Sequence, residues 1–371
     1  MDTLKKYPRV AIVHYWLVGM RGGERVLERL LHLYPQADII THVYDREAVS
    51  EIIRDRKVIT TFINKLPGAQ KHYQKYLPLM PAALEEVNLR GYDLVISSES
   101  GPAKGVITAP DALHICYCHS PMRYLWDHYH DYRSQAGVMS RTVMPPLFHY
   151  LRMWDISTAA RIDSVVANSN FIRKRIKKSW GRDASVVYPP VATDLFQPSN
   201  DVSDKYLWVG QMTPYKRADI VVDAFNELKA PLLMIGKGEL SKSIARRAKS
   251  NITILPHVSF EELRQAYANC RALIFPAEED FGIIPVEANA AGRPVIAYGK
   301  GGAAETIIDR KTGIFFKEQT ALSLTQTITE FESWLPHFDP GDAIENASRF
   351  STPAFDENMR AAISAAERDC A

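Results

Sequence analysis

Short hydrophobic runs alternate with amphipathic stretches along most of the chain. The run Val10–His14 is apolar and rich in β-branched residues, and Gly22-Gly23 follows it. The next stretch, Glu24–Tyr34, places its large apolar residues on one helical face. Runs that are hydrophobic throughout are typical of strands buried on both faces of a parallel sheet. The pattern therefore predicts repeated strand–helix units.

The predicted strands form two series, with helical patterns such as Ala218–Leu228 and Phe260–Asn269 between them. The first series is expected at Val10–His14, Ile39–Val43, Val58–Thr61, Leu94–Ser97, Leu113–Cys116, Ser164–Ala167 and Val186–Tyr188. The second is expected at Tyr206–Val209, Leu232–Ile235, Ile252–Leu255, Ala272–Phe275, Pro294–Ala297 and Ile314–Phe316. Two series predict an α/β protein with two Rossmann-like, doubly wound domains.

A proline-rich stretch after the first series marks the expected joint between the domains. We expect a first domain at 1–195, a second at 196–350 and a helical tail at 351–371, after the break at Ser351-Thr352-Pro353. Ligands of doubly wound sheets bind outside the carboxyl ends of the strands. Two such domains are therefore expected to face each other across a cleft, with functional residues just after strands.

Composition excludes several classes of protein. The longest stretch without Asp, Glu, Lys or Arg is 11 residues, whereas a membrane-spanning helix needs about 20. No apolar segment follows the charged N-terminus, so no secretory signal is expected. The four cysteines form no CxxC pair, and no HExxH motif occurs. We expect free thiols in a reducing cytoplasm and no structural zinc.

Charge is divided unevenly along the chain. Residues 1–200 carry 26 Lys and Arg against 19 Asp and Glu, a balance of +7. Residues 201–371 carry 19 against 24, a balance of −5, which gives the overall +2. Such an asymmetry indicates that the first half meets an anionic partner.

The strongest local signal lies between Glu279 and Ala288, after the predicted strand Ala272–Phe275. Two glutamates, Glu279 and Glu287, are separated by seven residues, the first in a loop and the second in a helix near Pro285. Carboxylates can hold vicinal sugar hydroxyls, and amides at a helix N-terminus can bind an anion. A pair of surface glutamates is the plain alternative for this motif alone.

Other strand ends carry glycines and cations as well. Lys216-Arg217 and Gly236–Gly238 follow strands of the second series, as does Gly299–Glu305. In the first series, Gly22-Gly23 and His119–Arg123 follow strands. Glycine allows close backbone contact with a ligand, and adjacent cations can neutralise a diphosphate.

These residues together carry a family resemblance that covers nearly the whole chain. Val209–Arg217, Glu279–Ala288, Gly299–Glu305, Gly22–Val26 and His119–Pro121 resemble the motifs of retaining glycosyltransferases of family 4. That family has the GT-B architecture and includes bacterial O-antigen and capsule mannosyltransferases. The resemblance implies an acceptor-binding first domain, a second domain that binds the nucleotide-sugar, and a last helix that crosses back to the first domain.

The resemblance also implies roles for single residues. Glu279 would lie beside the donor sugar, Lys216 would stabilise the departing diphosphate and His119 would contact the sugar near the reacting carbon. Glu287 would bind the ribose hydroxyls, and Arg217 would assist Lys216. Further donor-binding positions would be Gly236, Val258, Phe281, Gly282, Ile283 and Ile284, and Gly22 and Gly23 would form an acceptor or phosphate loop.

One departure concerns the phosphate site. The family usually has arginine where this chain has Gln211, five residues before Lys216. Its absence weakens the expected clamp on the diphosphate, and Arg217 is the candidate replacement. No Asp-x-Asp occurs, and the family is thought to use front-face attack, so we expect no catalytic metal.

Four other functions compete with glycosyl transfer. A nicotinamide oxidoreductase would need Gly-x-Gly-x-x-Gly, and a P-loop enzyme would need its own glycine motif; neither occurs. A sugar-nucleotide epimerase of the same two-domain build stays open. A catalytically inactive relative that acts as an assembly partner also stays open.

The expected partners follow from the resemblance and the charge. GDP-mannose is the expected co-substrate, with no other cofactor, because His119–Tyr124 and Pro214–Asp219 look most like O-antigen and capsule mannosyltransferases. The expected acceptor is a saccharide linked to undecaprenyl diphosphate. Basic and aromatic residues in Asn64–Pro81 and Arg173–Trp180 suit an anionic membrane surface, so we expect a cytoplasmic protein on the inner face of the membrane. No nucleic-acid reader module is found.

Overall fold

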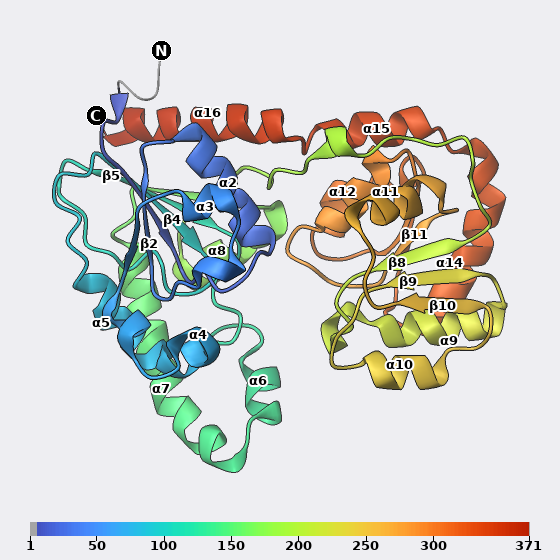
Figure 1. Ribbon diagram of the computed structural model, residues 1–371, viewed down its shortest axis with the longest axis horizontal. Helices are drawn as coiled ribbons and strands as arrows, with labels where there is room; N and C mark the ends of the chain where they lie inside the picture. The colour runs from blue at the N-terminus through green and yellow to red at the C-terminus, as the bar shows by residue number, and fades with distance from the viewer. Residues whose placement is uncertain (1–5, 371) are drawn as a thin grey trace. The chain divides into compact units, whose positions relative to one another are not determined.

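A computed structural model describes residues 6–370, which fold as two units (Figure 1). One unit contains the chain up to Tyr188 together with the segment from Asp356 onward. The other contains Pro189–Phe355. Each unit is built on its own parallel sheet, as the two series of hydrophobic runs predict.

The first unit contains a seven-stranded sheet of order β3-β2-β1-β4-β5-β6-β7. All of its pairings are parallel. The strand order reverses between β1 and β4, the position where doubly wound sheets bind ligands. The strands are β1 (Val10–His14), β2 (Asp38–Thr41), β3 (Val58–Thr60), β4 (Leu94–Glu99), β5 (Leu113–Cys118), β6 (Ser164–Ala167) and β7 (Ser185–Val186).

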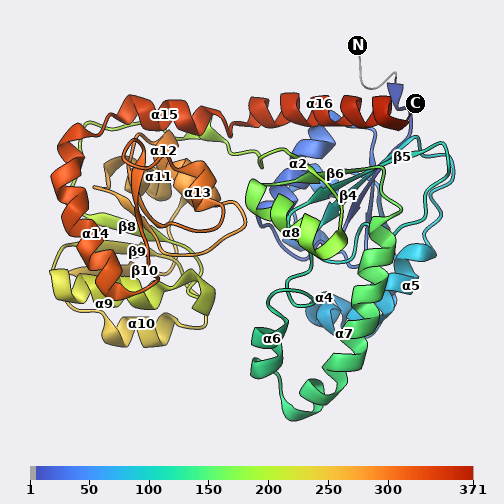
Figure 2. The ribbon, with the colours of Figure 1, turned by 180° about the vertical axis from the view of Figure 1, so that it is seen from behind.

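Helices lie on both faces of this sheet (Figures 1 and 2). The long helix α7 (Val138–Ala159) and the amphipathic α8 (Asn170–Trp180) pack behind it in the view of Figure 1. The remaining helical elements are α2 (Gly22–Leu33), α3 (Glu51–Arg54), α4 (Ala69–His72), α5 (Met80–Glu85), α6 (Tyr129–Gln135) and the 3-10 segments η1 (Arg46–Ala48), η2 (Phe62–Lys65) and η3 (Tyr73–Leu79).

The second unit repeats the design with six parallel strands of order β10-β9-β8-β11-β12-β13. Its order reverses between β8 and β11. The strands are β8 (Tyr206–Val209), β9 (Leu232–Ile235), β10 (Ile252–Leu255), β11 (Leu273–Phe275), β12 (Val295–Tyr298) and β13 (Gly313–Phe316). The helices are α9 (Ala218–Leu228), α10 (Ser241–Arg247), α11 (Phe260–Asn269), α12 (Ile283–Ala290), α13 (Ala303–Thr306), α14 (Ala321–Trp334) and α15 (Pro340–Ser348), with 3-10 segments η4 (Thr193–Leu195), η5 (Pro214–Lys216) and η6 (Leu335–His337).

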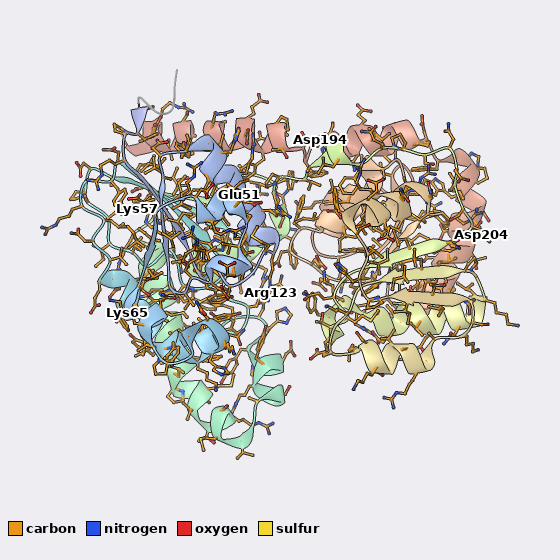
Figure 3. The ribbon with its side chains drawn as sticks, viewed as in Figure 1. Glu51, Lys57, Lys65, Arg123, Asp194 and Asp204 are labelled. Carbon is orange, nitrogen blue, oxygen red and sulfur yellow. The ribbon has the colours of Figure 1, made fainter. Side chains whose placement is uncertain are left out.

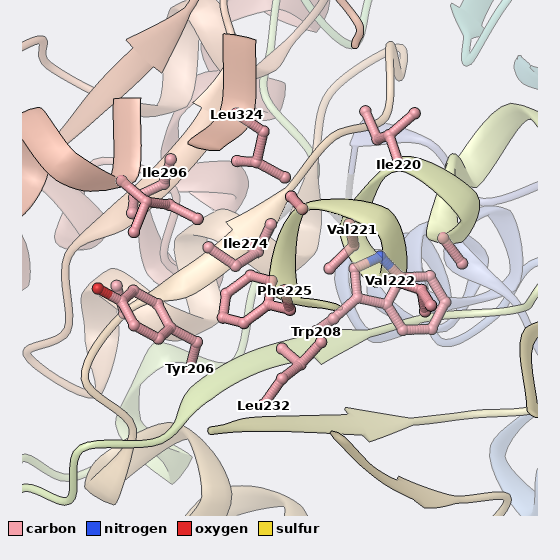
Figure 4. Packing of buried hydrophobic residues seen from close by; sticks show 14 of the residues in the cluster. Tyr206, Trp208, Ile220, Val221, Val222, Phe225, Leu232, Ile274, Ile296 and Leu324 are labelled. Carbon is pink, nitrogen blue, oxygen red and sulfur yellow. The ribbon is translucent and has the colours of Figure 1, made fainter. Parts of the chain in front are cut away.

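The core of the second unit shows why its apolar runs form these layers. Trp208 and Leu232 from the sheet pack against Val221 and Phe225 of α9 (Figure 4). These side chains are buried, and burying such a side chain stabilises the fold by about 1.5–3 kcal/mol.

Helix α16 (Thr352–Cys370) carries the chain into the first unit. Arg29 of α2 forms an ion pair with Asp356, and Lys6 forms one with Glu367. Met359 and Ile363, one helical turn apart, are buried. Their spacing of four residues puts them on one face of the helix.

Strand positions agree with the sequence predictions except near the ends. Strands β4 and β5 each run two residues further than predicted, because Ser98 and Glu99 pair with Tyr117 and Cys118 in the interior. Strand β7 ends at Val186 rather than at Tyr188. The following Pro189 and Pro190 lack the N–H groups that a ladder requires.

Two further features concern the cysteines and the length of the apolar helices. Cys116, Cys118 and Cys270 are buried free thiols. Among the described helices, none is both long enough and apolar enough to cross a bilayer.

Candidate functional site

Glycine allows the first two loops of the second unit to pack backbone against backbone. Gly210 follows β8 and donates its N–H to Ile235 at 3.0 Å. Gly236 follows β9 with φ +140°, and a Cβ there would lie 1.8 Å from the carbonyl oxygen of Gly210. A Cβ at Gly238 would lie 2.6 Å from the carbonyl oxygen of Met212. The contact therefore excludes larger residues and holds the loop that leads to Lys216.

Lys216 and Glu279 meet at the point where the strand order of the second sheet reverses. Lys216 ends the short 3-10 segment after β8, and Glu279 lies in the loop after β11. Their side chains form a half-buried ion pair. The structure thus brings together two residues that lie 63 positions apart in the sequence.

A second pair of glycines holds the loop that carries Glu279. Gly302 donates its N–H to the carbonyl of Glu279 at 2.8 Å. A Cβ at Gly302 would lie 2.2 Å from Cα of Phe281, and one at Gly301 would lie 2.5 Å from the carbonyl oxygen of Glu279. Sequence analysis noted the Gly299–Glu305 motif without assigning it this task.

Glu287 is oriented by a residue that the sequence analysis missed. Its carboxylate accepts a hydrogen bond of 2.7 Å from the hydroxyl of Tyr267, a buried residue in the last turn of α11. Burial, followed by the charge of Glu287, raises the pKa of Tyr267, so the phenol stays a donor. An aromatic residue near a helix end carries no spacing signal toward a glutamate 20 residues later.

The residues between the two glutamates begin α12. Gly282 has φ +90°, a left-handed conformation that favours glycine. Phe281 is buried against Phe350, with ring centroids 5.5 Å apart. Ile283 and Ile284 are half-buried in the first helical turn, whose N–H groups lack partners within the helix.

The remaining predicted donor-binding residues lie in other loops of this sheet. Val258 is half-buried after β10, just before Ser259, which caps α11. Arg217 is held by Asp219, with Nε–Oδ1 at 3.0 Å, and by Gln319 at 3.0 Å. Its guanidinium is therefore already committed to neutral and acidic partners, so it is a weaker replacement for the arginine absent at Gln211.

The carboxyl end of the first sheet holds a different kind of cluster. His14 ends β1, Ser98 lies in β4 and His119 follows β5. The hydroxyl of Ser98 is 3.0 Å from Nδ1 of His14 and 2.8 Å from Nε2 of His119. Glu24 of α2 lies on the far side of His14, with Oε1 3.8 Å from Nε2.

The contacts of this chain are consistent with one arrangement of its protons. Burial, with a smaller effect of His14, lowers the pKa of His119 to about 3, so its imidazole is neutral. The Glu24 carboxylate favours a proton on the near nitrogen of His14, which leaves Nδ1 of His14 to accept the Ser98 hydroxyl proton. The Ser98 oxygen then accepts Nε2–H of His119. Nδ1 of His119 is thereby an acceptor, suited to the hydroxyl of a neutral ligand.

Gly22 and Gly23 begin α2 next to this cluster. The Glu24 side chain caps the start of the helix, because it accepts the backbone N–H of Arg21 at 2.8 Å. A Cβ at Gly23 would lie 2.4 Å from the hydroxyl of Tyr15. Gly22 is exposed.

A buried ionic group supports the end of β4. Lys104 is fully buried and forms ion pairs with Glu99 and Asp155. Asp155 also accepts hydrogen bonds of 2.8 Å from the indoles of Trp126 and Trp180. The carbonyl of Glu99 accepts the N–H of His119 at 2.8 Å, so this group anchors the strand end that carries Ser98 and His119.

The expectation that Arg173–Trp180 forms a membrane-binding surface is wrong in two respects. Trp180 is buried and bound to Asp155, because it continues the buried i, i+4 row of Ile172 and Ile176. Arg175 is paired with Asp127 and donates to Ser120 at 3.0 Å. In Asn64–Pro81, by contrast, the lysines are exposed.

Within residues 6–370, no three His, Cys, Asp or Glu side chains are placed to share a metal ion.

Two family descriptions match the chain. "Glycosyltransferase Family 4" matches residues 20–195, and "Glycosyl transferases group 1" matches residues 195–334. An uncharacterized glycosyltransferase of Methanocaldococcus jannaschii is 30% identical over 173 residues, covering 45% of this chain and 49% of that protein. A GDP-mannose-dependent alpha-(1-6)-phosphatidylinositol monomannoside mannosyltransferase of Mycolicibacterium smegmatis is 29% identical over 184 residues, covering 41% and 48%. The chain thus spans about half the length of these curated relatives.

Solved structures match over nearly the whole chain. Anabaena HepE in complex with UDP has a TM-score of 0.71 at 16% identity, covering 96% of this chain and 100% of that one. The lipopolysaccharide outer core galactosyltransferase WaaB has a TM-score of 0.65 at 16% identity, covering 96% and 98%. At these identities the likeness is one of fold, the two-sheet GT-B architecture.

Proposed function

The chain belongs to the group 1 and family 4 glycosyltransferases, and from this premise we propose that it transfers a hexose from a nucleotide-sugar with retention of anomeric configuration. The observation that carries the proposal is the Lys216–Glu279 pair at the reversal point of the second sheet. A cation and a carboxylate held there on glycine-packed loops suit a ligand with an anionic diphosphate and a hydroxyl-rich sugar.

The proposed donor arrangement assigns one part of the nucleotide-sugar to each group. Lys216 leaves Glu279 for the diphosphate, which frees the Glu279 carboxylate for the sugar hydroxyls. Glu287, oriented by Tyr267, holds the ribose hydroxyls. The first-turn amides of α12 add fixed positive dipoles beside the phosphates.

The proposed reaction is a front-face substitution. The bond between the anomeric carbon and the phosphate oxygen breaks, and the acceptor oxygen bonds to that carbon on the same face. The acceptor proton passes to the departing phosphate oxygen. Lys216 stabilises the negative charge that grows on the diphosphate, the kind of preorganised stabilisation that contributes most to catalysis. Neutral His119 accepts a hydrogen bond from the donor sugar through Nδ1.

The proposed donor is GDP-mannose, and the proposed acceptor is a saccharide linked to undecaprenyl diphosphate in O-antigen or capsule synthesis. The mycobacterial relative is named as GDP-mannose-dependent, which supports mannose. HepE was solved with UDP-glucose, which makes a uridine nucleotide the competitor to test. The proposed location is the cytoplasmic side of the membrane, where the acceptor lipid is found.

Thermal unfolding with a panel of nucleotide-sugars tests the donor. A ligand at 100 times its dissociation constant stabilises the folded state by about 2.7 kcal/mol. GDP-mannose is expected to raise Tm, whereas UDP-glucose and UDP-galactose should leave it unchanged. Stabilisation by a uridine sugar alone would overturn the choice of mannose. Donor turnover without acceptor would point to the epimerase, and no turnover with any acceptor to the inactive relative.

Chelation tests the absence of a metal from the proposed mechanism. Transfer should be unchanged in EDTA, because Lys216 and backbone amides make the phosphate site and no Asp-x-Asp occurs in the sequence. Loss of activity in chelator, with recovery in Mg²⁺ or Mn²⁺, would contradict the mechanism.

A further inference from the structure

Helix α7 carries large apolar side chains on a face that no described segment covers. Five of them follow an i, i+4, i+7, i+11, i+14 spacing, which places them in one stripe along the helix. Met139 is 84% exposed, Val143 54% and Met153 53%. We call this set the α7 stripe: Met139, Val143, Pro146, Tyr150 and Met153.

The same helix already has a buried face. Phe148, Leu151 and Trp154 belong to the hydrophobic core of the first unit. A soluble surface helix needs one apolar face, with polar residues on the other. The α7 stripe is therefore additional to what folding requires, and a large exposed apolar patch marks an interaction site.

The part of the first unit that carries the stripe is also rich in cations. Residues 62–84, which include η2, α4 and η3, and residues 128–154, which include α6 and most of α7, form a helical lobe at the lower end of the first unit in Figure 1. Leu77 of η3 packs against the cluster that contains Phe148 and Leu151, so the two segments lie together. Figure 3 labels Lys65 on this lobe.

The lobe accounts for most of the positive charge of the first half. It contains six cations, Lys65, Lys71, Lys75, Arg133, Arg141 and Arg152, and one carboxylate, Asp131. Its balance of +5 compares with +7 for residues 1–200. The neighbouring carboxylates Glu85 and Asp155 are paired with Arg161 and Lys104. Within the described residues, none of the six cations forms an ion pair.

We propose that the α7 stripe and the cations of this lobe dock the protein on an anionic lipid surface. Apolar side chains would enter the boundary between headgroups and acyl chains, and the lysines and arginines would contact the phosphates above it. A second copy of the chain fits this surface less well. A two-fold interface would place the same surface on both subunits and bring six cations against six.

This inference deepens the proposed function, since a lipid-linked acceptor lies at such a surface, but its evidence is independent of the donor site. It keeps the expected surface at Asn64–Pro81, adds α7 to it and leaves out α8. Helix α8 keeps exposed Arg173, Lys174 and Lys178 but has no exposed large apolar residue.

Vesicle co-sedimentation of the full chain tests the proposal. The wild type should pellet with vesicles of phosphatidylglycerol and phosphatidylcholine at low salt and be released by high salt. Replacing Lys65, Lys71 and Lys75 by Gln should weaken binding about 100-fold, at about fivefold for each cation. The stripe variant Met139→Ser, Val143→Ser and Met153→Ser should weaken it by tenfold or more, since each side chain loses part of about 1.5–3 kcal/mol of burial.

Matched control variants test whether vesicle binding depends on the lobe itself or on any exposed apolar or basic residues. Ile52→Ser, Ile107→Ser and Leu322→Ser remove three exposed apolar side chains elsewhere, and Arg173→Gln, Lys174→Gln and Lys178→Gln remove three cations of α8. Both triple variants should pellet like the wild type. Equal pelleting with pure phosphatidylcholine, or unchanged pelleting of the stripe variant, would overturn the proposal. So would a wild-type dimer in solution that the stripe variant dissociates.

Stabilisation by nucleotide-sugars, measured on the same variants, separates this inference from the proposed function. The lobe variants should keep the wild-type thermal shift. Vesicle binding without any nucleotide-sugar shift would leave the docking surface intact and refute the transferase proposal. A thermal shift with nucleotide-sugars but no vesicle binding would refute the docking surface and leave the transferase proposal intact.

Discussion

The carboxyl ends of the two sheets are equivalent in topology but hold opposite kinds of polar groups. In the second unit, Lys216 and Glu279 are charged, half-buried and carried by loops that glycines hold together. In the first unit, the buried His14 and Ser98 lie on strands and connect to the half-buried His119 just after β5. Charged side chains suit the binding of a charged ligand group. Side chains held by hydrogen bonds suit the recognition of uncharged hydroxyl groups. The difference supports the proposal that the diphosphate binds at the second unit and uncharged parts of the substrates bind at the first.

The largest effect is expected from removing the charge at the second sheet. Lys216→Ala should lower kcat by about 10²–10³, the scale seen when one group that stabilises transition-state charge is lost. Glu287→Ala should instead raise the donor KM, since ribose is held alike in the ground and transition states. Steady-state kinetics distinguish the two, with exposed Lys242→Ala as the control. Wild-type kcat in Lys216→Ala would remove Lys216 from the phosphate site.

The glycine contacts of the second unit give the next largest effect. A Cβ at position 236 would lie 1.8 Å from a backbone oxygen, and the φ of +140° is unfavourable for other residues. Gly236→Ala should therefore distort the loop that leads to Lys216, at about 1–3 kcal/mol, and weaken donor binding by tenfold or more. Gly299→Ala is the matched control, because its nearest new contact is an ordinary 3.4 Å. Titration calorimetry with the donor compares them.

Much of this architecture is predictable from local pattern, whereas the partners of the site residues are not. Hydrophobic runs locate all thirteen strands of the two sheets, because burial on both faces leaves a continuous local signal. The Tyr267–Glu287 and Ser98–His119 hydrogen bonds join residues about 20 apart whose proximity depends on packing between elements. Trp180 could have been placed correctly, since its i+4 spacing from Ile176 continues a buried row.

Acid should lower the stability of the first unit more than that of the second, because the first unit contains buried histidines that are neutral. Burial lowers the pKa of His42 to about 3 and of His114 to about 4, like that of His119. Below the unfolded pKa near 6.5, the unfolded chain binds protons that the folded unit does not, so stability falls as pH falls. Glu99 acts in the opposite direction, since burial raises its pKa to about 7.

Between pH 7 and pH 6, proton uptake by the three histidines in the unfolded chain lowers the unfolding free energy by about 2 kcal/mol. Protonation of Glu99 in the folded unit raises it by about 1 kcal/mol, so the net decrease is about 1 kcal/mol. Calorimetry at the two pH values measures it on the transition of the first unit. His42→Gln should reduce the acid sensitivity by about a third of the histidine contribution. A transition of the first unit that is independent of pH would mean that these histidines are protonated in the fold.

The smallest effect is expected from a pair of serine variants that distinguish the orientation of the His119 ring from the stability of strand β4. Ser97 and Ser98 are neighbours in β4, and both are fully buried. The Ser97 hydroxyl lies 3.0 Å from Nε2 of His114, whereas the Ser98 hydroxyl lies 2.8 Å from Nε2 of His119 and 3.0 Å from Nδ1 of His14. Replacing either by Ala leaves a buried nitrogen without that partner, at a cost of about 1–3 kcal/mol in unfolding free energy.

Only Ser98→Ala also frees the ring of His119 to exchange its proton between nitrogens. Ser98→Ala should therefore lower kcat/KM about fivefold, on the scale of about 1 kcal/mol for one hydrogen bond, while Ser97→Ala leaves it unchanged. Tm should fall in both variants, and at least as far in Ser98→Ala, so the kinetics are compared at a temperature where both variants are fully folded. Equal kinetics would show that the Ser98 contact is structural. A lower kcat/KM in Ser98→Ala alone would show that a buried neutral hydrogen bond in the first unit supports a reaction whose charge is managed in the second.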